Sequence, residues 1–120
     1  MSIRRKQVTL GPTDGAGAFS VNVTAPGLVR AVAVDLGTLS TPDIAITDTV
    51  TGDNILTVAG IAADTRYQPK IVATDPADGS ALDTAGDVAY ESPACMGTMT
   101  IAVTGGGAVT TGTLYLLLEG

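Results

Sequence analysis

Residues 99–104 read Met-Thr-Ile-Ala-Val-Thr, a stretch in which apolar residues alternate strictly with small or polar ones. Successive side chains of a β-strand point to opposite faces, so this pattern predicts a strand with one face against a core. The same alternation recurs in residues 19–24, 44–47 and 114–118. Four such stretches in one chain predict an all-β fold.

The segment 28–36 predicts a different kind of strand. Its larger side chains, those of Val32, Val34 and Leu36, share one face, whereas Ala31 and Ala33 share the other. Two apolar faces indicate a strand that is covered on both sides, which is typical of a central strand. Weaker strand patterns bring the expected number of strands to about eight, and they lie at residues 3–10, 55–59, 67–74 and 88–92.

Residues that favour turns separate these strands. The turn signals are Gly11-Pro12, Ala25-Pro26-Gly27, Thr51-Gly-Asp-Asn54, Asp75-Pro-Ala-Asp-Gly79 and Gly105-Gly-Gly107. Gly105 to Gly107 is expected to be a long hairpin turn. Strands at this spacing predict a single-domain antiparallel β-sandwich or jelly roll over residues 11–120, preceded by an N-terminal arm or edge strand over residues 1–10.

The composition agrees with one β domain. The chain has 120 residues, of which 45% are hydrophobic and only 15% charged, and aromatic residues are scarce. The core is therefore expected to consist of Val, Ile, Leu and Ala with the single Phe19. Cys95 is the only cysteine, which excludes an intrachain disulfide, and we expect a buried apolar side chain there. No long apolar run is present, so neither a secretion signal nor a membrane span is expected.

Charge is distributed unevenly along the chain. The net charge is -6, yet Arg4, Arg5 and Lys6 supply half of the six basic residues. The rest of the chain is strongly acidic and would repel phosphate backbones, so nucleic-acid binding is not expected. The basic start is a candidate element for binding an acidic protein surface, with residues 2–10 adding as an edge strand to a neighbour. The alternative is a solvated end that keeps the chain soluble.

The residue types argue against the commonest hydrolases. There is no histidine and only one cysteine, which excludes Ser-His-Asp and Cys-His nucleophile systems. Catalysis by paired carboxylates stays open on residue types alone, but the acidic residues fall mostly in turn signals. We therefore expect a protein that is not an enzyme.

One group of acidic residues is a candidate set of ligands for a metal ion. Asp75, Asp78 and Asp83 surround a glycine in a long polar stretch, and such oxygen-rich loops can hold calcium. The stretch lacks the EF-hand pattern, so we expect an ordinary acidic turn and no cofactor, with calcium as the alternative. Asp43 and Asp48 flank a predicted strand on opposite faces and are not expected to form one site.

The last strand has two apolar faces. Tyr115 and Leu117 fall opposite Leu114, Leu116 and Leu118, where a solvated face would be polar. Either the strand is central and both faces are covered within one subunit, or Tyr115 and Leu117 form a subunit interface.

Four motifs in order carry a resemblance to a known class of proteins. They are Val34-Asp-Leu-Gly37, Thr41-Pro-Asp-Ile-Ala-Ile-Thr-Asp48, Thr51-Gly-Asp-Asn-Ile-Leu-Thr57 and Tyr67-Gln-Pro-Lys70, followed by a glycine-rich last connection. Over roughly residues 28–118 the chain resembles small all-β virion proteins of tailed bacteriophages.

The resemblance implies a capsid decoration (cement) protein, made in the host bacterial cytoplasm and located on the virion. Such a protein would bind the major capsid protein on the outer head surface as a homotrimer and stabilise the head. Two alternatives remain open from the sequence, namely a phage tail or baseplate structural protein and a bacterial surface- or carbohydrate-binding β-sandwich module.

Overall fold

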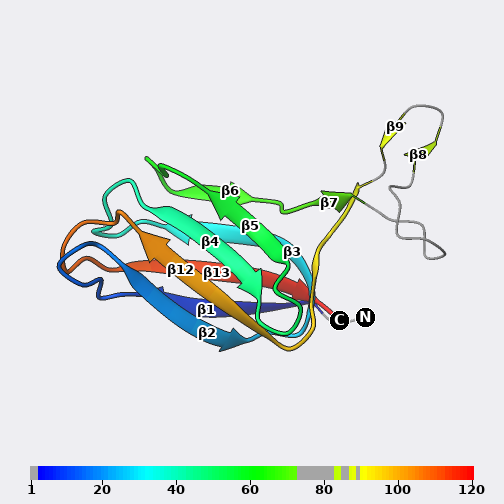
Figure 1. Cartoon of the computed structure of the whole chain (residues 1–120), viewed down its shortest axis with the longest axis horizontal. Coiled ribbons are helices and arrows are strands. Elements are labelled where there is room, and N and C mark those ends of the chain that lie inside the picture. Colours follow the sequence, from blue (N-terminus) through cyan, green and yellow to red (C-terminus); the bar gives the residue numbers. More distant parts are fainter. Residues whose placement is uncertain (1–2, 73–82, 85–86, 89) are drawn as a thin grey trace.

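Two antiparallel β-sheets lie face to face in the computed structural model, which describes residues 3–72, 83–84, 87–88 and 90–120 (Figure 1). Sheet A has the order β1 (Ile3–Leu10), β13 (Gly112–Glu119), β3 (Gly27–Asp35), and the far edge of β3 pairs with both β6 (Thr65–Tyr67) and β11 (Ala94–Cys95). Sheet B has the order β2 (Phe19–Thr24), β12 (Thr98–Thr104), β4 (Asp43–Asp48), β5 (Asn54–Val58). Two short pairs complete the description: β7 (Ile71–Val72) with β10 (Tyr90–Glu91), and β8 (Asp83–Thr84) with β9 (Asp87–Val88). This arrangement confirms the predicted all-β sandwich.

The strand predictions hold best where the alternation is strict. β2, β3, β4, β12 and β13 begin and end within two residues of the predicted bounds. The single strand predicted over 67–74 is wrong: Tyr67 is the last residue of β6, and Ile71–Val72 form the separate strand β7. The break between them contains Pro69, which has no backbone N–H to donate to a ladder. Residues 73 and 74 lie outside the described part, as does residue 89 within the predicted strand 88–92.

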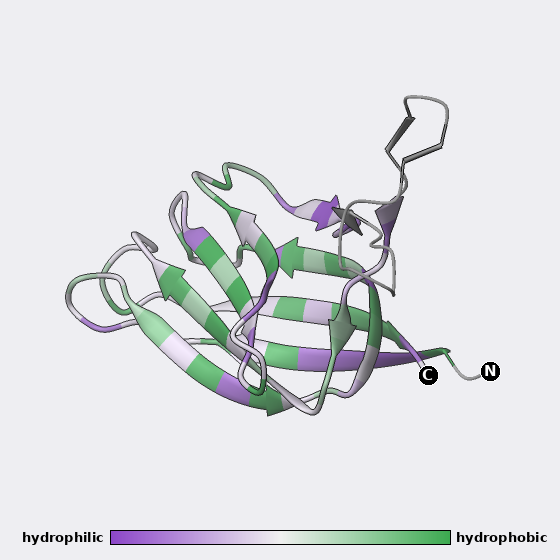
Figure 2. Cartoon of the chain, turned by 45° about the vertical axis from the view of Figure 1, so that its right-hand side comes forward, coloured by the Kyte–Doolittle hydropathy of each residue, from purple (hydrophilic) through white to green (hydrophobic). Residues whose placement is uncertain are grey.

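The core lies between the two sheets, because the long strands turn their apolar residues inward. Figure 2 shows hydrophobic and hydrophilic residues alternating along these strands. Sheet A contributes Leu114, Leu116 and Leu118 of β13, and sheet B contributes Met99, Ile101 and Val103 of β12, all of them buried. Aliphatic side chains thus form the core, as predicted, and Phe19 packs half-buried against it. Cys95 is buried, which confirms its expected environment.

The prediction that β3 is a central strand is also confirmed. One edge of β3 pairs with β13, and the other edge pairs with β6 and β11. Val32 and Val34 face the core, while Ala31 and Ala33 point to the outer face of sheet A.

The prediction of a hairpin turn at Gly105 to Gly107 is wrong. This segment connects β12 in sheet B to β13 in sheet A, so it is an arch between the sheets. The arch interlocks with two other loops at one end of the sandwich, because Gly106 donates its N–H to the Gly17 carbonyl at 3.0 Å and accepts from Ser40 N–H at 2.9 Å. A Cβ atom at Gly17, whose φ is +82°, would lie 2.8 Å from the Gly107 nitrogen, so only glycine fits there.

The leucine row of β13 gives the first test of this architecture. Leu116 is fully buried, so Leu116→Ala should lower the free energy of unfolding by about 2–5 kcal/mol through lost burial and a residual cavity. Urea denaturation measures this change. The control is Ser20→Ala on the outer face of sheet B, which should change it by less than about 0.5 kcal/mol. Equal effects of the two substitutions would contradict the assigned core.

Candidate protein-docking face

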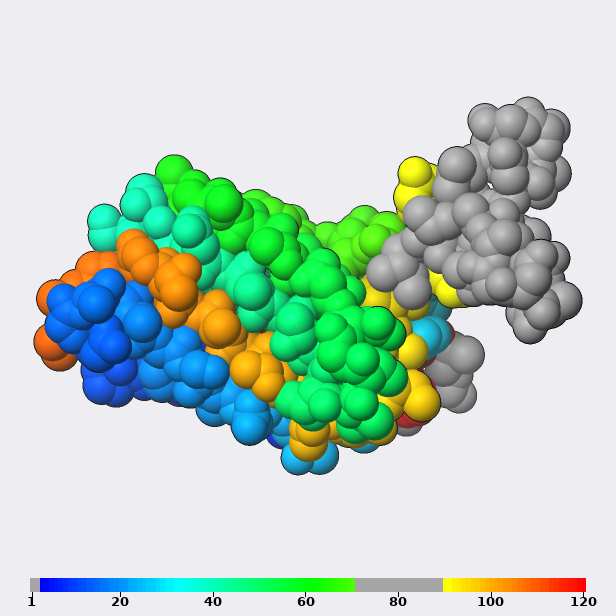
Figure 3. All heavy atoms as spheres, in the orientation of Figure 1, coloured from blue at the N-terminus to red at the C-terminus, as the bar shows by residue number. Residues whose placement is uncertain are grey.

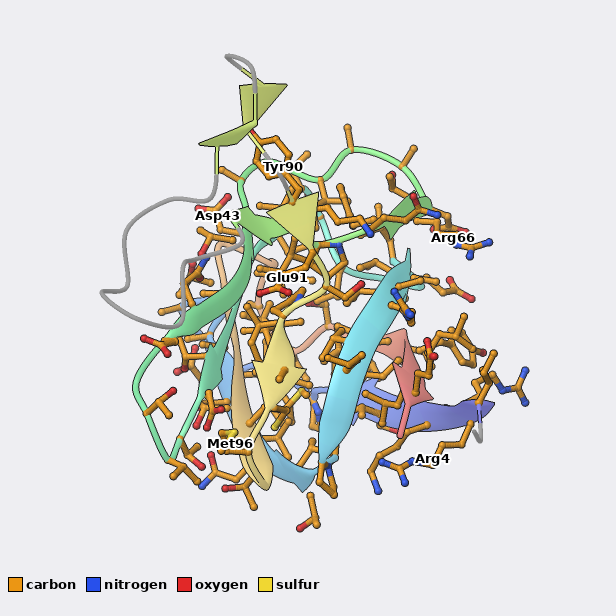
Figure 4. The ribbon with its side chains drawn as sticks, turned by 90° about the vertical axis from the view of Figure 1, so that its right-hand side faces the viewer. Arg4, Asp43, Arg66, Tyr90, Glu91 and Met96 are labelled. Carbon is orange, nitrogen blue, oxygen red and sulfur yellow. The ribbon has the colours of Figure 1, made fainter. Side chains whose placement is uncertain are left out.

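Five of the six basic residues of the chain lie on strands of sheet A. Arg4, Arg5 and Lys6 lie on β1, Arg30 on β3 and Arg66 on β6, and Lys70 follows β6 in the chain. The four strands of sheet B contain no lysine or arginine. Figure 4 shows Arg4 and Arg66 on the side of sheet A and Asp43 on the opposite side. An otherwise acidic protein therefore concentrates most of its positive charge on one sheet.

Strand register brings a few of these side chains together on the outer face of sheet A. Leu117 lies between Arg5 of β1 and Ala31 of β3. In the next outward row, Tyr115 lies beside Ala33, which in turn pairs with Arg66 of β6. Residues paired across a sheet share a face, so the two rows form one continuous surface.

This surface is hollowed into a groove with a volume of about 220 Å³. Its apolar floor and walls are capped by one arginine from each side, and we call it the sheet A groove. The lining residues are Arg5, Ala31, Ala33, Arg66, Tyr115, Leu116 and Leu117.

The structure places the predicted interface residues Tyr115 and Leu117 inside this groove. β13 is a central strand with β1 and β3 as neighbours, yet both side chains remain only half-buried. Both edges of β13 are thus paired with neighbouring strands of the same chain. Among the described residues, none packs over its outer face closely enough to bury Tyr115 and Leu117. A role for Tyr115 and Leu117 in a subunit interface stays a prediction.

The three basic residues predicted as one binding element are divided between two faces. Arg5 points outward, and its guanidinium lies 5.5 Å from the centroid of the Tyr115 ring, a cation–π distance. Arg4 and Lys6 share the other side of β1 with the core residue Val8, and the Arg4 guanidinium donates to the Pro26 carbonyl. Figure 2 shows the hydrophilic start of β1. Their role in partner binding stays a prediction.

Residues 3–10 form an edge strand of this chain's own sheet A rather than an extended arm. β1 pairs with β13 over its whole length, which leaves one edge open among the described residues. Charged side chains on the core side of an edge strand discourage further strand addition. Arg4 and Lys6 occupy such positions, so the geometry does not favour the predicted strand addition to a neighbour.

Arg5 and Arg66 differ from Arg30 in their charge partners. Arg30 forms an ion pair with Glu119, lowering the pKa of that carboxyl, and also donates to the Ser92 hydroxyl at 3.1 Å. Within the described ranges, no carboxylate lies within 4 Å of the guanidinium of Arg5 or Arg66. These two guanidinium groups can therefore bind a carboxylate of another molecule.

A buried carboxylate organises a second surface feature. Asp48 is only 1% exposed, and its oxygens accept the backbone N–H groups of Met96 at 2.9 Å and Val50 at 2.8 Å. These hydrogen bonds, chiefly that from Met96, lower the pKa of Asp48 below its ordinary value. Because its donors lie in the turn after β4 and at Met96, just before β12, Asp48 has a structural role and joins these two segments. The side chains of Val50 and Met96 themselves are 65% and 64% exposed.

The outer face of sheet B has a contrasting character. Its central part is uncharged and rich in hydroxyl groups. Figure 3 presents this face, with β2, β12, β4 and β5 in front. Thr100 donates to the Asn22 side chain at 2.8 Å across the β2–β12 pair. The residues of this central part are Ser20, Asn22, Thr24, Ala45, Thr47, Thr57, Thr98, Thr100 and Ala102.

The predicted acidic candidates are not brought together in the described part. Asp75 and Asp78 lie outside it, and so does the side chain of Asp83; within it, no group of three metal-ligating residues is found. Asp43 is exposed and accepts from Gly60 N–H at 2.7 Å, whereas Asp48 is buried, which confirms that they lie on opposite faces.

Comparisons with protein-family models, with curated proteins and with solved structures find no match to this chain. Among the described residues, no helix has the length and apolar character needed to cross a membrane.

Sequence reasoning missed Arg66, Ala31 and Ala33 as parts of a surface site. The alanines were assigned correctly to one face of β3, but nothing in the sequence indicated that β6 pairs beside them. The missing information was the long-range pairing of β3 with β6.

Acid stability offers a test of the role of Asp48. A lowered pKa in the folded state means that this carboxylate stabilises the fold above about pH 4, and that the stabilisation is lost as the pH falls through the folded pKa. Asp48→Asn should therefore lower the melting temperature at neutral pH and reduce its further decline in acid. Thermal melts between neutral pH and about pH 2 measure both effects.

The matched control for that experiment is Asp53→Asn, an exposed residue of the same turn. It should leave the neutral melting temperature nearly unchanged. Some acid sensitivity should persist in Asp48→Asn, because hydrogen bonds also lower the pKa of Asp14 and of Glu119. If the melting temperature of Asp48→Asn declined in acid as steeply as that of the unsubstituted chain, Asp48 would be excluded as a source of the acid sensitivity.

Proposed function

We propose that this chain is a structural, non-enzymatic protein of a tailed-bacteriophage virion, specifically a capsid decoration protein. It binds the major capsid protein on the outer surface of the head and stabilises the head there. The sheet A groove is the observation that carries the proposal, because it combines an apolar floor with two arginines that have no carboxylate nearby in the described part.

The chemistry of the groove is that of a protein interface. Stable interfaces have an apolar centre surrounded by polar groups, and arginine and tyrosine are among the residues that contribute most to binding. The groove presents Tyr115 and Leu117 between Arg5 and Arg66, which lie at its two sides. Its position on a sheet face, rather than on a loop, keeps these residues fixed before a partner arrives.

The fold supports a role in an assembly. The sandwich needs no disulfide, since its only cysteine is a buried single residue, and three loops interlock at one end through backbone hydrogen bonds. The resemblance of residues 28–118 to small virion proteins adds the capsid as the target. The same features would serve a tail or baseplate protein, which is the second reading of that resemblance.

Location on the virion tests the proposal directly. Antibodies raised against the purified chain should label the heads of virions of the encoding phage in immunogold electron microscopy. Virions from which the gene is deleted serve as the control and should not be labelled. Labelling confined to tails would favour the tail or baseplate reading, and the absence of any label would overturn a virion role.

The proposed homotrimer has its own test. Light scattering of the purified chain at physiological salt should give about three times the chain mass of 11.9 kDa. The mass should be the same with calcium and with a chelator if no metal stabilises the assembly. A monomer would contradict the trimer in solution, and a mass that depends on chelator would indicate a metal in the assembly.

A further inference from the structure

We infer that the sheet A groove binds an extended acidic peptide segment of a partner protein, in which one apolar residue lies midway between two acidic residues. The inference rests on the proposed function only in taking the partner to be a protein, and it names the chemistry of the segment that this face holds.

The charges of the groove select an acidic ligand. Arg5 and Arg66 line it from opposite sides, and in the part of the chain that is described neither guanidinium has a carboxylate within 4 Å. The guanidinium of Arg5 is held over the ring of Tyr115, which limits its freedom before binding. Arginine binds a carboxylate through two parallel N–H donors, so each side of the groove can hold one acidic side chain.

The distance between the two arginines sets the spacing of the acidic residues. From β1 to β6 there are three steps between neighbouring strands. Along the strand direction, the positions of Arg5 and Arg66 are offset by two residues. With about 4.8 Å per step and about 3.4 Å per residue along a strand, their Cα atoms lie roughly 16 Å apart. An extended peptide spans about 13 Å from its first to its fifth residue, and the long arginine side chains cover the remainder.

The floor of the groove selects the residue between them. In an extended segment the first, third and fifth side chains point to the same side, so the third faces the floor when the other two meet the arginines. That floor is made by the methyl groups of Ala31 and Ala33, and the walls are the half-buried Tyr115 and Leu117. Small residues beside larger apolar ones leave room for an aliphatic side chain such as leucine.

Other ligand classes fit less well. A nucleic acid would bring phosphates to the arginines, but the net charge of -6 repels a polyanion. The alanine side chains of the floor also carry no polar group to bind a sugar. A second copy of this chain is an alternative occupant of the groove, and the experiment below distinguishes it from a peptide of another protein.

Titration of a labelled peptide tests the inference on the isolated chain. The probe is a fluorescein-labelled Gly-Glu-Ser-Leu-Ser-Glu-Gly peptide, and fluorescence polarisation should show saturable binding. Replacing both glutamates by glutamine, or the central leucine by serine, should weaken binding at least several-fold. The double variant Arg5→Gln with Arg66→Gln should bind at least about tenfold more weakly, because two charge-assisted contacts are lost.

The matched control removes the same charge from outside the groove. Lys6→Gln with Lys70→Gln changes the net charge equally, but neither lysine lines the groove, so binding should be nearly unchanged. Ala33→Leu fills the floor without changing any charge and should weaken binding as strongly as the arginine variant. Circular dichroism of each variant establishes that the β-sandwich is retained.

Several results would overturn the inference. Absence of saturable binding would do so, as would equal weakening by the arginine and lysine variants, which would indicate unspecific attraction. Equal binding of a single-stranded DNA oligonucleotide of the same length would point to phosphate recognition instead. An oligomer that dissociates in the arginine variant but not in the lysine variant would place a second copy in the groove.

The two proposals can fail separately. Peptide binding is measured on the isolated chain and requires no virion, so a failed titration leaves the immunogold result intact. Conversely, absence of the chain from virions would overturn the proposed function and leave a groove that binds acidic segments of some other protein.

Discussion

Leu114, Leu116 and Leu118 pack between the two sheets, and their burial fixes the orientation of β13. Because side chains of a strand alternate, the same burial turns Tyr115 and Leu117 outward. A slip of one residue would move the leucines to solvent, so the register of β13 with β1 and β3 is strongly specified. That register in turn places Arg5 beside Leu117. The groove is thus a direct consequence of how the core is packed.

The two ends of the sandwich are built by different means. At one end, loops that include Gly17 and Gly106 approach so closely that backbone groups bond to one another. At the other, the buried carboxylate of Asp48 joins the turn after β4 to the segment before β12. Both devices hold loops that would otherwise be mobile, so a partner that binds the sandwich meets surfaces that are already ordered.

Much of the fold could be predicted from the sequence, because strict alternation reports directly on burial. The positions of β2, β4, β12 and β13 follow from it, as does the central place of β3. What alternation cannot report is which strands pair. The glycine run at 105–107 was therefore assigned to a hairpin, whereas β12 and β13 belong to different sheets. The candidate site shows the same limit. Arg5, Tyr115 and Leu117 were singled out from local pattern, but Arg66 joins them only through the pairing of β6 with β3.

The pairing of β1 with β13 also has a consequence for how the chain folds. Ile3 lies opposite Glu119, so the first strand and the last strand of these 120 residues are neighbours in sheet A. During synthesis, β1 leaves the ribosome long before β13 has been made. Until then, its apolar residues Val8 and Leu10 remain exposed to solvent. Contacts between residues so distant in sequence make folding slow, since the chain must lose the entropy of a very long loop before they form. The basic run at the start of β1 gives the unpaired strand a positive charge, and this charge opposes premature association with other nascent chains.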